Sequence, residues 1–426
     1  MAFAKLGHEV IGIDSDSAKI AILESGRVPF YEPGLDEALV EVLAQGNIRF
    51  QTTQDANSGS ADIHLLCVGT PQSKTGLGAD TSYLFAALDS LAPFLLEDSV
   101  IAGKSTVPVG TAKELKAHLA QKVDFEPHFA WNPEFLREGT ALQDTLLPDR
   151  IVLGTDDSWS EKMLRLLYAP ITDLGVPLVS IDIPTAELVK VAANSFLATK
   201  ISFINAMAEV AEVAGADAVK LAEAIGYDER IGNKFLKTGI GFGGGCLPKD
   251  IRAFSARAEE LGVGHAVGFL REVEEINLRR RTRVIELARE ELGSLNGKRV
   301  VMLGAAFKPE TDDVRDSPAM AVAEQFWSAG ANVVIHDPKA LENVRRMYPH
   351  LETNDNLFDA MDGADLVVLA TEWREYRDAD PIQLAKLVTN RLVIDGRNAL
   401  DVGDWRAANW QVLALGRNLE RLPVLA

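Results

Sequence analysis

Short apolar runs alternate with amphipathic stretches through residues 1–183 of the chain. The runs indicate strands and the stretches indicate helices, an order typical of an α/β fold whose parallel sheet is covered by helices. The predicted strands are residues 8–14, 48–51, 62–68, 99–103, 128–131, 150–153 and 177–181. The predicted helices between them include residues 17–24, 33–44, 82–91 and 112–121.

The pattern changes at Pro184, a residue suited to the first turn of a helix. Apolar positions then recur at helical spacing to about residue 214, and further helices are predicted at 217–225, 248–261 and 265–292. After a turn-rich break at 293–298, strand-like runs return at 299–303, 332–336, 365–370 and 392–395, with helices at 318–329 and 381–388. Three domains are therefore predicted: an α/β domain at 1–183, a helical domain at 184–293 and a smaller α/β domain at 294–426.

The composition, 47% hydrophobic and 25% charged over 426 residues, is that of an ordinary globular protein. The net charge of −19 argues against a general affinity for nucleic acid or anionic membranes, but leaves room for a local basic pocket. Two cysteines, Cys67 and Cys246, are too few for a disulfide framework. No apolar run approaches the roughly 18 residues of a membrane span, and residues 1–14 lack a signal peptide's apolar core. We therefore expect a cytoplasmic protein with reduced thiols and, because the histidines are scattered, no metal site.

The first predicted strand ends in an acidic residue, Asp14, with Lys19 nearby. An acidic residue at the end of the second strand of a dinucleotide-binding unit hydrogen-bonds the adenosine ribose. Asp14 suits that place, although a solvated strand-end carboxylate is an equally good interpretation.

A dinucleotide-binding unit needs a first strand and a glycine-rich G-x-G-x-x-G turn before that position. Here the residues before the strand, Phe3 to Gly7, resemble the end of a helix. We therefore expect that about 20 residues of the unit are absent, judging from the usual spacing of the motif. A mis-assigned start is favoured over a real truncation, which would bind NAD weakly.

The segment 235–250 is the strongest candidate for chemistry, because five glycines precede a cysteine that opens a helix. A thiol at a helix N-terminus, with Lys249 close behind, is biased toward thiolate. Asp250 shares the helix face of Cys246 at i+4. A thiolate beside a carboxylate can form and then hydrolyse an acyl intermediate. A small buried cysteine after a tight turn is the alternative.

Two further pairs of polar residues point the same way. Lys190 and Asn194 share one face of the long central helix, where they could stabilise an oxyanion. Glu134 and Glu138 follow the strand 128–131, at the edge where parallel sheets bind ligands. Solvated helix residues and a plain polar loop are the respective alternatives.

Four loops after predicted strands carry hydroxyls or cations. Those at 68–71 and 104–108 hold Thr70 and Thr106 at the edge of the first sheet. Those at 307–315 and 395–397 belong to the last domain, where their position favours a phosphate or uracil pocket. Ordinary turns would explain each loop taken alone.

Together these motifs resemble the UDP-glucose/GDP-mannose dehydrogenase family over essentially the whole chain. The similarity lies in Tyr31-Glu-Pro-Gly34, Val68-Gly-Thr-Pro71, Lys104-Ser-Thr-Val-Pro108, Asn132-Pro-Glu-Phe-Leu-Arg-Glu138, Ala198-Thr-Lys-Ile-Ser-Phe-Ile-Asn205, Arg230-Ile-Gly-Asn-Lys-Phe-Leu236 and Gly243-Gly-Gly-Cys-Leu-Pro-Lys-Asp250. The resemblance implies two Rossmann-like domains, for NAD and for a UDP-sugar, joined by a helical domain whose long helix forms a homodimer core. It also implies oxidation of a sugar C6 alcohol to a carboxylate with two NAD reduced.

In such enzymes Cys246 carries a thiohemiacetal and then a thioester. The resemblance assigns Asp250 and Thr106 to the water, Lys190 and Asn194 to the oxyanion, and Glu134 to base catalysis. It assigns NAD contacts to Asp14, Lys19, Thr70, Thr106, Glu138 and Arg315. It assigns substrate contacts to Glu134, Phe135, Leu136, Lys190, Asn194, Arg230, Phe235, Lys237, Gly243, Phe307, Lys308 and Arg397, with Arg230 reaching the partner subunit's site.

The residues Arg230-Ile-Gly and the sequence of the central helix resemble the UDP-glucose branch of the family more than its GDP-mannose and UDP-ManNAc branches. The family usually has a serine where this chain has Gly245, which we expect to alter rate rather than reaction type. Two alternatives stay open: a silent nucleotide-sugar-binding protein lacking the NAD loop, and a two-electron hydroxyacid dehydrogenase that needs no thiol.

Overall fold

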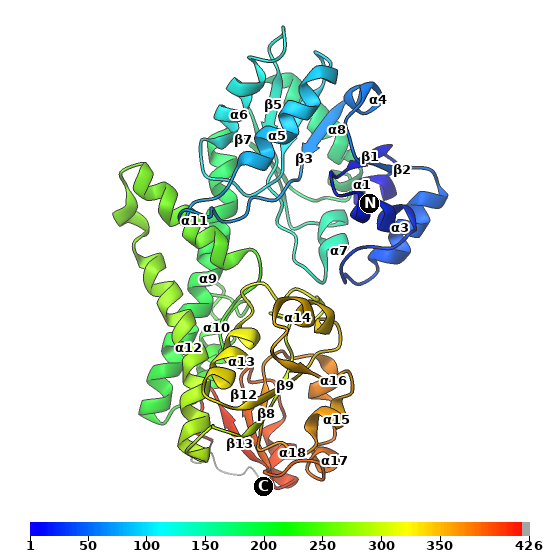
Figure 1. Cartoon of the computed structure of the whole chain (residues 1–426). Coiled ribbons are helices and arrows are strands. Elements are labelled where there is room, and N and C mark those ends of the chain that lie inside the picture. Colours follow the sequence, from blue (N-terminus) through cyan, green and yellow to red (C-terminus); the bar gives the residue numbers. More distant parts are fainter. Residues whose placement is uncertain (420–426) are drawn as a thin grey trace. The chain divides into compact units, whose positions relative to one another are not determined.

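The computed structural model describes residues 1–419 of the chain. The chain forms two compact units, one of residues Met1–Ala193 with Lys249–His265 and the other of Asn194–Pro248 with Ala266–Ala426. Two helices, α9 (Ile183–Ala214) and α11 (Leu247–Glu260), continue from one unit into the other (Figure 1). The segment 184–293, predicted as one helical domain, therefore contributes to both units, and the three-domain division stays a prediction.

The first unit is built on a five-stranded sheet of order β3-β4-β5-β6-β7. Its strands are β3 (Ile63–Leu66), β4 (Val100–Gly103), β5 (His128–Trp131), β6 (Ile151–Thr155) and β7 (Leu178–Ile181). Neighbours are parallel except β5 and β6, which are antiparallel. The sheet is therefore mostly parallel, as predicted, with one antiparallel pair where the chain leaving β5 does not cross back over the sheet before β6 begins.

Two strands predicted for the same sheet form a sheet of their own. These are β1 (Val10–Ile13) and β2 (Ile48–Gln51), which pair in parallel. Within residues 1–419, β1 pairs only with β2 and β3 pairs only with β4, so each has one edge without a strand partner. Every residue of β1 is half-buried, whereas every residue of β4 is buried. The expected absence of a first strand is not tested by this pairing and stays a prediction.

Helices cover both faces of the five-stranded sheet, and β4 shows how its side chains alternate. Ile101 packs on one face against α5 (Ser82–Leu91) and α6 (Thr111–Leu119). Val100 and Ala102 pack on the other face against α8 (Ser158–Thr172). This period of two is what a strand buried on both sides requires. The remaining elements of the unit are α1 (Ala2–Lys5), α2 (Ser17–Glu24), α3 (Leu35–Ala44), α4 (Ala56–Gly59), η1 (Ala92–Phe94), α7 (Ala141–Leu146) and η2 (Gly264–Val267), the last of which spans the unit boundary.

The second unit joins helices to a six-stranded parallel sheet of order β10-β9-β8-β11-β12-β13. Its strands are β8 (Arg299–Leu303), β9 (Asn332–His336), β10 (Glu352–Thr353), β11 (Leu366–Leu369), β12 (Leu392–Asp395) and β13 (Gln411–Ala414). The strand order reverses between β8 and β11, the point where such sheets bind ligands. Its helices besides α9 are α10 (Ala218–Gly226), α12 (Phe269–Leu292), α13 (Pro318–Ser328), α14 (Leu341–Met347), α15 (Leu357–Met361), α16 (Arg374–Arg377), α17 (Pro381–Leu384) and α18 (Val402–Ala407).

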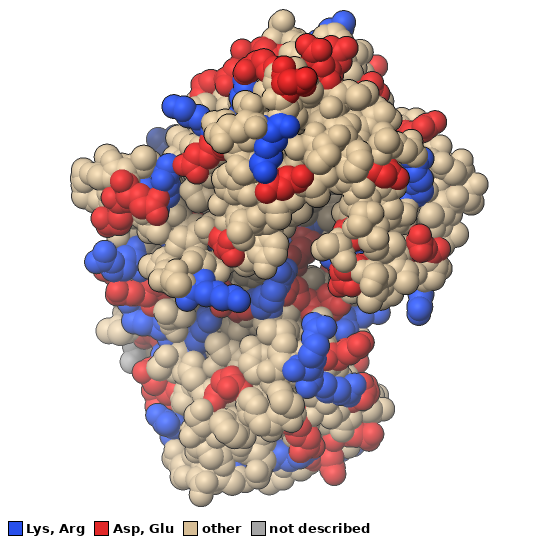
Figure 2. Space-filling view, turned by 45° about the horizontal axis from the view of Figure 1, so that its top comes forward, with Lys and Arg blue, Asp and Glu red and all other residues tan. Residues whose placement is uncertain are grey.

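The surface agrees with the acidic composition. Acidic and basic side chains are both spread over the face shown in Figure 2, so this face offers no broad basic surface for a polyanion. Among the described residues, no helix is both long enough and apolar enough to cross a membrane.

Candidate active site

The loops that follow β3 and β4 are bonded to each other at the carboxyl edge of the sheet. Thr70 Oγ1 donates to the backbone carbonyl of Thr106 at 2.6 Å, and Ser105 Oγ donates to that of Val68 at 2.6 Å. Lys104 Nζ donates to Asn132 Oδ1, after β5, at 2.8 Å. The hydroxyl residues predicted from the sequence therefore lie together on one fixed edge.

The loop that follows β5 brings three predicted residues together. Lys190 Nζ, on a side chain of which only 7% is exposed, lies 3.1 Å from Glu134 Oε1. The same ammonium lies 5.6 Å from the ring centroid of Phe135, which the Arg150 guanidinium covers at 3.7 Å. A charge this buried is stable only because it is paired. Glu134, Phe135 and Lys190 thus form one cluster, with Leu136 exposed beside it.

Two buried glutamates that were not among the predicted site residues hold these loops in place. Glu187, on α9, accepts hydrogen bonds from the N–H groups of Gly110 and Ala112, both at 2.7 Å. Glu32 accepts from those of Gly139 and Ala141, also both at 2.7 Å. Burial raises the pKa of Glu187 above its usual value, although the two N–H groups and Arg257 favour the charged form. The partners are 75 to 109 residues apart in sequence, so no local signal could reveal them.

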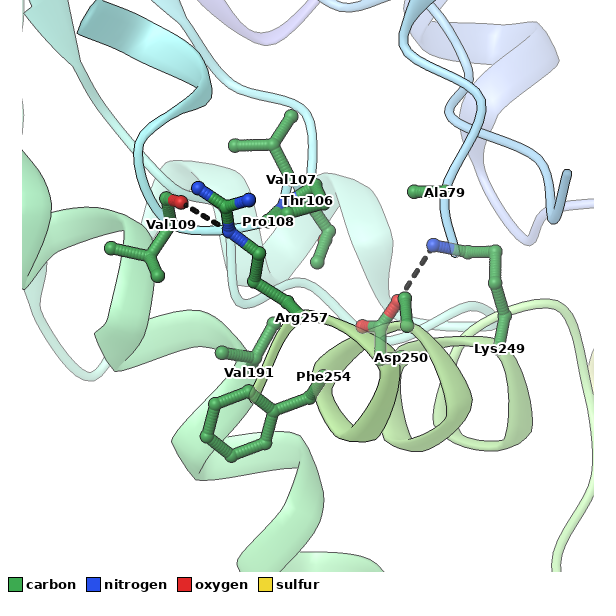
Figure 3. Close-up of a pocket in the computed structure, with 11 residues that line it drawn as sticks. Ala79, Thr106, Val107, Pro108, Val109, Val191, Lys249, Asp250, Phe254 and Arg257 are labelled. Atoms are coloured by element: carbon green, nitrogen blue, oxygen red, sulfur yellow. Dashed lines mark hydrogen bonds and ion pairs between the residues drawn. The ribbon is translucent and has the colours of Figure 1, made fainter. Parts of the chain in front are cut away.

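A small cavity in the first unit lies beside Asp250 (Figure 3). The cavity volume of about 10 Å³ is enough for one water molecule. Asp250, 1% exposed, pairs with Lys249 at 2.6 Å, and Arg257 Nε donates to the carbonyl of Val109 at 2.9 Å. Lys249, predicted to bias the thiol, is thus bonded to a carboxylate. The cavity is lined by Ala79, Thr106, Val107, Pro108, Val109, Val191, Lys249, Asp250, Ala253, Phe254 and Arg257.

Residues 235–248 of the cysteine segment lie in the second unit, where side chains from two helices hold their backbone. Asn277 of α12 accepts from the Phe242 N–H at 2.7 Å and donates to the Phe242 carbonyl at 3.0 Å. Asn205 of α9 accepts from the Gly239 N–H at 2.9 Å. Cys246 immediately precedes α11, is exposed and forms no disulfide. The sequence located the thiol but gave no sign of the two asparagines that fix its loop.

Two of the glycines in this segment have clear structural reasons. Gly241 has φ +90, and a Cβ there would lie 2.1 Å from Asn277 Oδ1. A Cβ on Gly245 would lie 2.8 Å from the Arg315 guanidinium, the mobile end of a long side chain. Arg315 also pairs with Asp313 at 2.7 Å. A serine at position 245 would therefore require only that Arg315 move, whereas alanine at 241 would break the loop's support.

The predicted substrate residues of the second unit fall into two groups. Arg397 donates to the carbonyls of Ala370, Gly241 and Phe307 at 2.7, 2.9 and 2.9 Å, so it binds three loops together. Lys308 Nζ lies 5.5 Å from the Phe307 ring. Of the other predicted residues, Arg230 pairs with Asp228 at 2.6 Å, and Phe235 and Lys237 are exposed.

At the end of β1, Asp14 is held by its neighbours. The Asp16 N–H donates to Asp14 Oδ1 at 3.0 Å, and Lys19 Nζ lies 2.5 Å from Oδ2. Partial burial opposes ionisation, but these bonds outweigh it and keep the pKa of Asp14 below its usual value. A charged carboxylate at a strand end is suited to accept hydrogen bonds from ribose hydroxyls.

Comparison with known proteins agrees with this arrangement. Residues 1–172, 184–279 and 301–402 match, respectively, the NAD binding, central and UDP binding domains of the UDP-glucose/GDP-mannose dehydrogenase family. The chain is 36% identical over 422 residues to UDP-glucose 6-dehydrogenase YwqF of Bacillus subtilis (strain 168), covering 98% of this chain and 94% of that protein. It is 38% identical to UDP-glucose 6-dehydrogenase of Rickettsia conorii, covering 97% and 95%.

Solved structures give the same result. A UDP-glucose dehydrogenase from the hyperthermophilic archaeon Pyrobaculum islandicum superposes with a TM-score of 0.87 at 35% identity, over 96% of this chain and 94% of that one. The UDP-D-ManNAc dehydrogenase of Pyrococcus horikoshii gives 0.84 at 25% identity, over 98% and 95%. The chain belongs to the UDP-glucose/GDP-mannose dehydrogenase family.

Proposed function

We propose that this protein oxidises C6 of UDP-glucose to a carboxylate, giving UDP-glucuronate in a four-electron, NAD-dependent reaction. The observation that carries the proposal is Cys246, an exposed thiol at the start of α11 on a loop whose backbone is fixed by buried amides. The helix N-terminus stabilises a thiolate, the nucleophile that an acyl intermediate requires.

The first unit supplies residues suited to NAD. Asp14 would accept from the adenosine ribose, with Lys19, Thr70, Thr106 and Glu138 as further contacts, and Arg315 is the one contact proposed from the second unit. When bound, NAD accepts the hydride of each of the two oxidations. The open edges of β1 and β3 support one more proposal, that a further strand joins their two sheets and carries the glycine-rich turn for the pyrophosphate.

The thiol divides the reaction into two oxidations. Cys246 Sγ adds to the C6 aldehyde to give a thiohemiacetal, which loses a hydride and a proton to become a thioester. Water then attacks the thioester carbon, and the C–S bond breaks to release the carboxylate and the thiol. Lys190 and Asn194 would stabilise the oxyanion, Asp250 and Thr106 would hold the water, and Glu134 would take its proton. The cavity beside Asp250 and Thr106 supports the water's place.

The second unit would hold the UDP part of the substrate. Phe307 and Lys308 follow β8 at the point where the strand order reverses. Arg397 is assigned to the same pocket, where three of its N–H groups already fix the loops around it. Gly243, Arg230, Phe235 and Lys237 complete the proposed set, with Arg230 reaching a second subunit.

A dimer is proposed from α9, which exposes large apolar side chains at seven-residue spacing. Phe196, Phe203 and Val210 are 66%, 50% and 59% exposed. Residues seven apart lie on one helix face, so these three form a stripe that a second copy of α9 would bury. Sedimentation at micromolar concentration would show a dimer, and Phe203→Glu would shift it to monomer.

The function is tested by counting the NADH formed per sugar nucleotide, with UDP-glucose, GDP-mannose and UDP-ManNAc offered in turn. We expect two NADH and one carboxylate per UDP-glucose. Cys246→Ser should abolish acid formation, whereas the control Cys67→Ser should keep it. A Cys246→Ser variant that kept full activity would favour the two-electron dehydrogenase, and UDP-glucose binding without NAD binding by calorimetry would favour the silent binding protein.

A further inference from the structure

Glu32 and Glu187 have the same geometry in different parts of the first unit. Each is a buried carboxylate, 7% and 2% exposed, whose two oxygens accept from two backbone N–H groups two residues apart. We propose that both are positioning residues for the oxidation, each fixing a loop that carries a group acting on the substrate. This inference rests on the proposed function.

Glu187 replaces a cap that α6 cannot provide for itself. The residue before α6 is Gly110, at φ +97, which has no side-chain oxygen to accept from the first N–H groups of the helix. Glu187 supplies those acceptors and places a negative charge where the helix dipole favours it. Thr106 lies four residues before Gly110, and its carbonyl is bonded to Thr70. The loop that carries Thr106 is therefore held at one end by Thr70 and at the other by Glu187.

Glu32 has the same relation to α7. Thr140 precedes this helix but makes no side-chain cap bond, and the N–H groups of Gly139 and Ala141 donate to Glu32 instead. Glu138 is the neighbour of Gly139, and Glu134 at the start of the loop pairs with Lys190. The loop that carries both acidic residues is thus fixed by Lys190 at one end and Glu32 at the other.

The test replaces each carboxylate by the amide that matches it in shape. Glu187→Gln and Glu32→Gln each lose one of two acceptors, because the amide NH₂ would face an N–H group. We expect kcat with UDP-glucose to fall on the order of ten- to a hundredfold, while KM for UDP-glucose changes less than about threefold, because misplaced groups slow the reaction more than they weaken binding.

Double variants separate positioning from a general structural effect. If Glu187 acts through Thr106, then Glu187→Gln should lower kcat little further in a Thr106→Ala protein. Glu32→Gln should likewise add little to Glu134→Gln. Effects that multiply fully in both pairs would overturn the proposal. Glu187→Asp and Glu32→Asp, which keep the charge but withdraw it by one methylene, should show the same pattern and serve if a glutamine variant folds poorly.

A matched control is Asp157→Ala, because Asp157 accepts from the Ser160 N–H at 2.8 Å at the start of α8, away from both loops. It should lower the melting temperature and leave kcat unchanged. The outcomes separate the two claims: an unmodified protein that fails to oxidise UDP-glucose would overturn the proposed function. An active protein whose glutamine variants keep full kcat would overturn the positioning role alone.

Discussion

The strands of both units run mostly parallel, but they form one continuous sheet in the second unit and two separate sheets in the first. The strands β8, β11 and β12 of the second unit lie inside one six-stranded sheet, and nearly all their residues are buried. In the first unit, β1 and β3 each have an open edge, and seven of their eight residues are half-buried. Strand neighbours on both sides, rather than apolar composition, thus decide how deeply a strand is buried.

The two units also differ in how the loops at the carboxyl ends of their strands are fixed. In the second unit the carboxylates come from the strand ends themselves: Asp337 follows β9 and accepts from the Ala305 N–H at 2.7 Å, and Asp395 ends β12 and accepts from the Leu400 N–H at 2.8 Å. In the first unit, the equivalent carboxylates Glu32 and Glu187 come from remote elements. These loops are therefore held by carboxylates at the ends of the sheet's own strands in the second unit, and by carboxylates from outside the strands in the first.

The largest difference between the sheets is expected in amide exchange. In β1, Val10 and Asp14 donate to β2, so the intervening N–H groups of Ile11 and Ile13 point to the open edge. These two should exchange with deuterium on the order of a thousandfold faster than Val301 in the central strand β8. Hydrogen exchange read by NMR measures this directly. Equal protection would mean that some other group covers the edge of β1.

Acid should weaken the first unit through His64 on β3. Burial lowers the pKa of His64 to about 4, from 6.5. Between these values the unfolded chain binds a proton that the folded unit does not, so stability falls as the pH drops from 6.5 to 4, by up to about 3 kcal/mol. In the six-stranded sheet of the second unit, burial also lowers the pKa of His336. His336 differs from His64 in that its Nδ1 is hydrogen-bonded to Tyr376 Oη at 2.8 Å, whereas His64 Nε2 is buried without a partner.

The free energy of unfolding is measured by urea denaturation of the whole protein at several pH values between 4 and 6.5. His64→Gln should flatten the dependence, whereas His265→Gln, a change at an exposed position, should not. An unchanged slope in His64→Gln would show that the imidazole is not the group responsible.

The smallest difference is expected from trimming one apolar side chain in each sheet. Ile394 of β12 is fully buried, and Ile394→Ala should cost about 2–5 kcal/mol of unfolding free energy. Ile11 of β1 is half-buried, so Ile11→Ala should cost only about 1 kcal/mol, in proportion to the area it buries. Chemical denaturation of both variants compares them. A cost for Ile11→Ala equal to that for Ile394→Ala would contradict the reading of β1 as loosely packed.

Local patterns predicted much of the fold. The helix at 82–91 matches α5, and the helix from Pro184 to about 214 matches α9, because apolar spacing alone determines such elements. The reversed direction of β6 and the separate β1–β2 sheet were not predicted, since pairing depends on bonds between distant strands. Short helices such as α16 carry too few residues for a periodic signal.

In the candidate site, too, some residues were predicted from local sequence patterns and others were not. Cys246 was selected from the sequence because glycines precede it and a helix begins directly after it. The residues that hold its loop, Asn205 and Asn277, come from α9 and α12 and show no local motif. Sequence patterns thus locate reactive groups more readily than the side chains that orient them.

The contact between Gly241 and Asn277 limits how this sequence can evolve. A methyl group at position 241 would overlap the Asn277 amide at 2.1 Å, so a change at either position alone would loosen the loop that precedes Cys246. In related genes the two positions should stay fixed together or change together, a paired signature that would mark the loop in chains whose other motifs have faded.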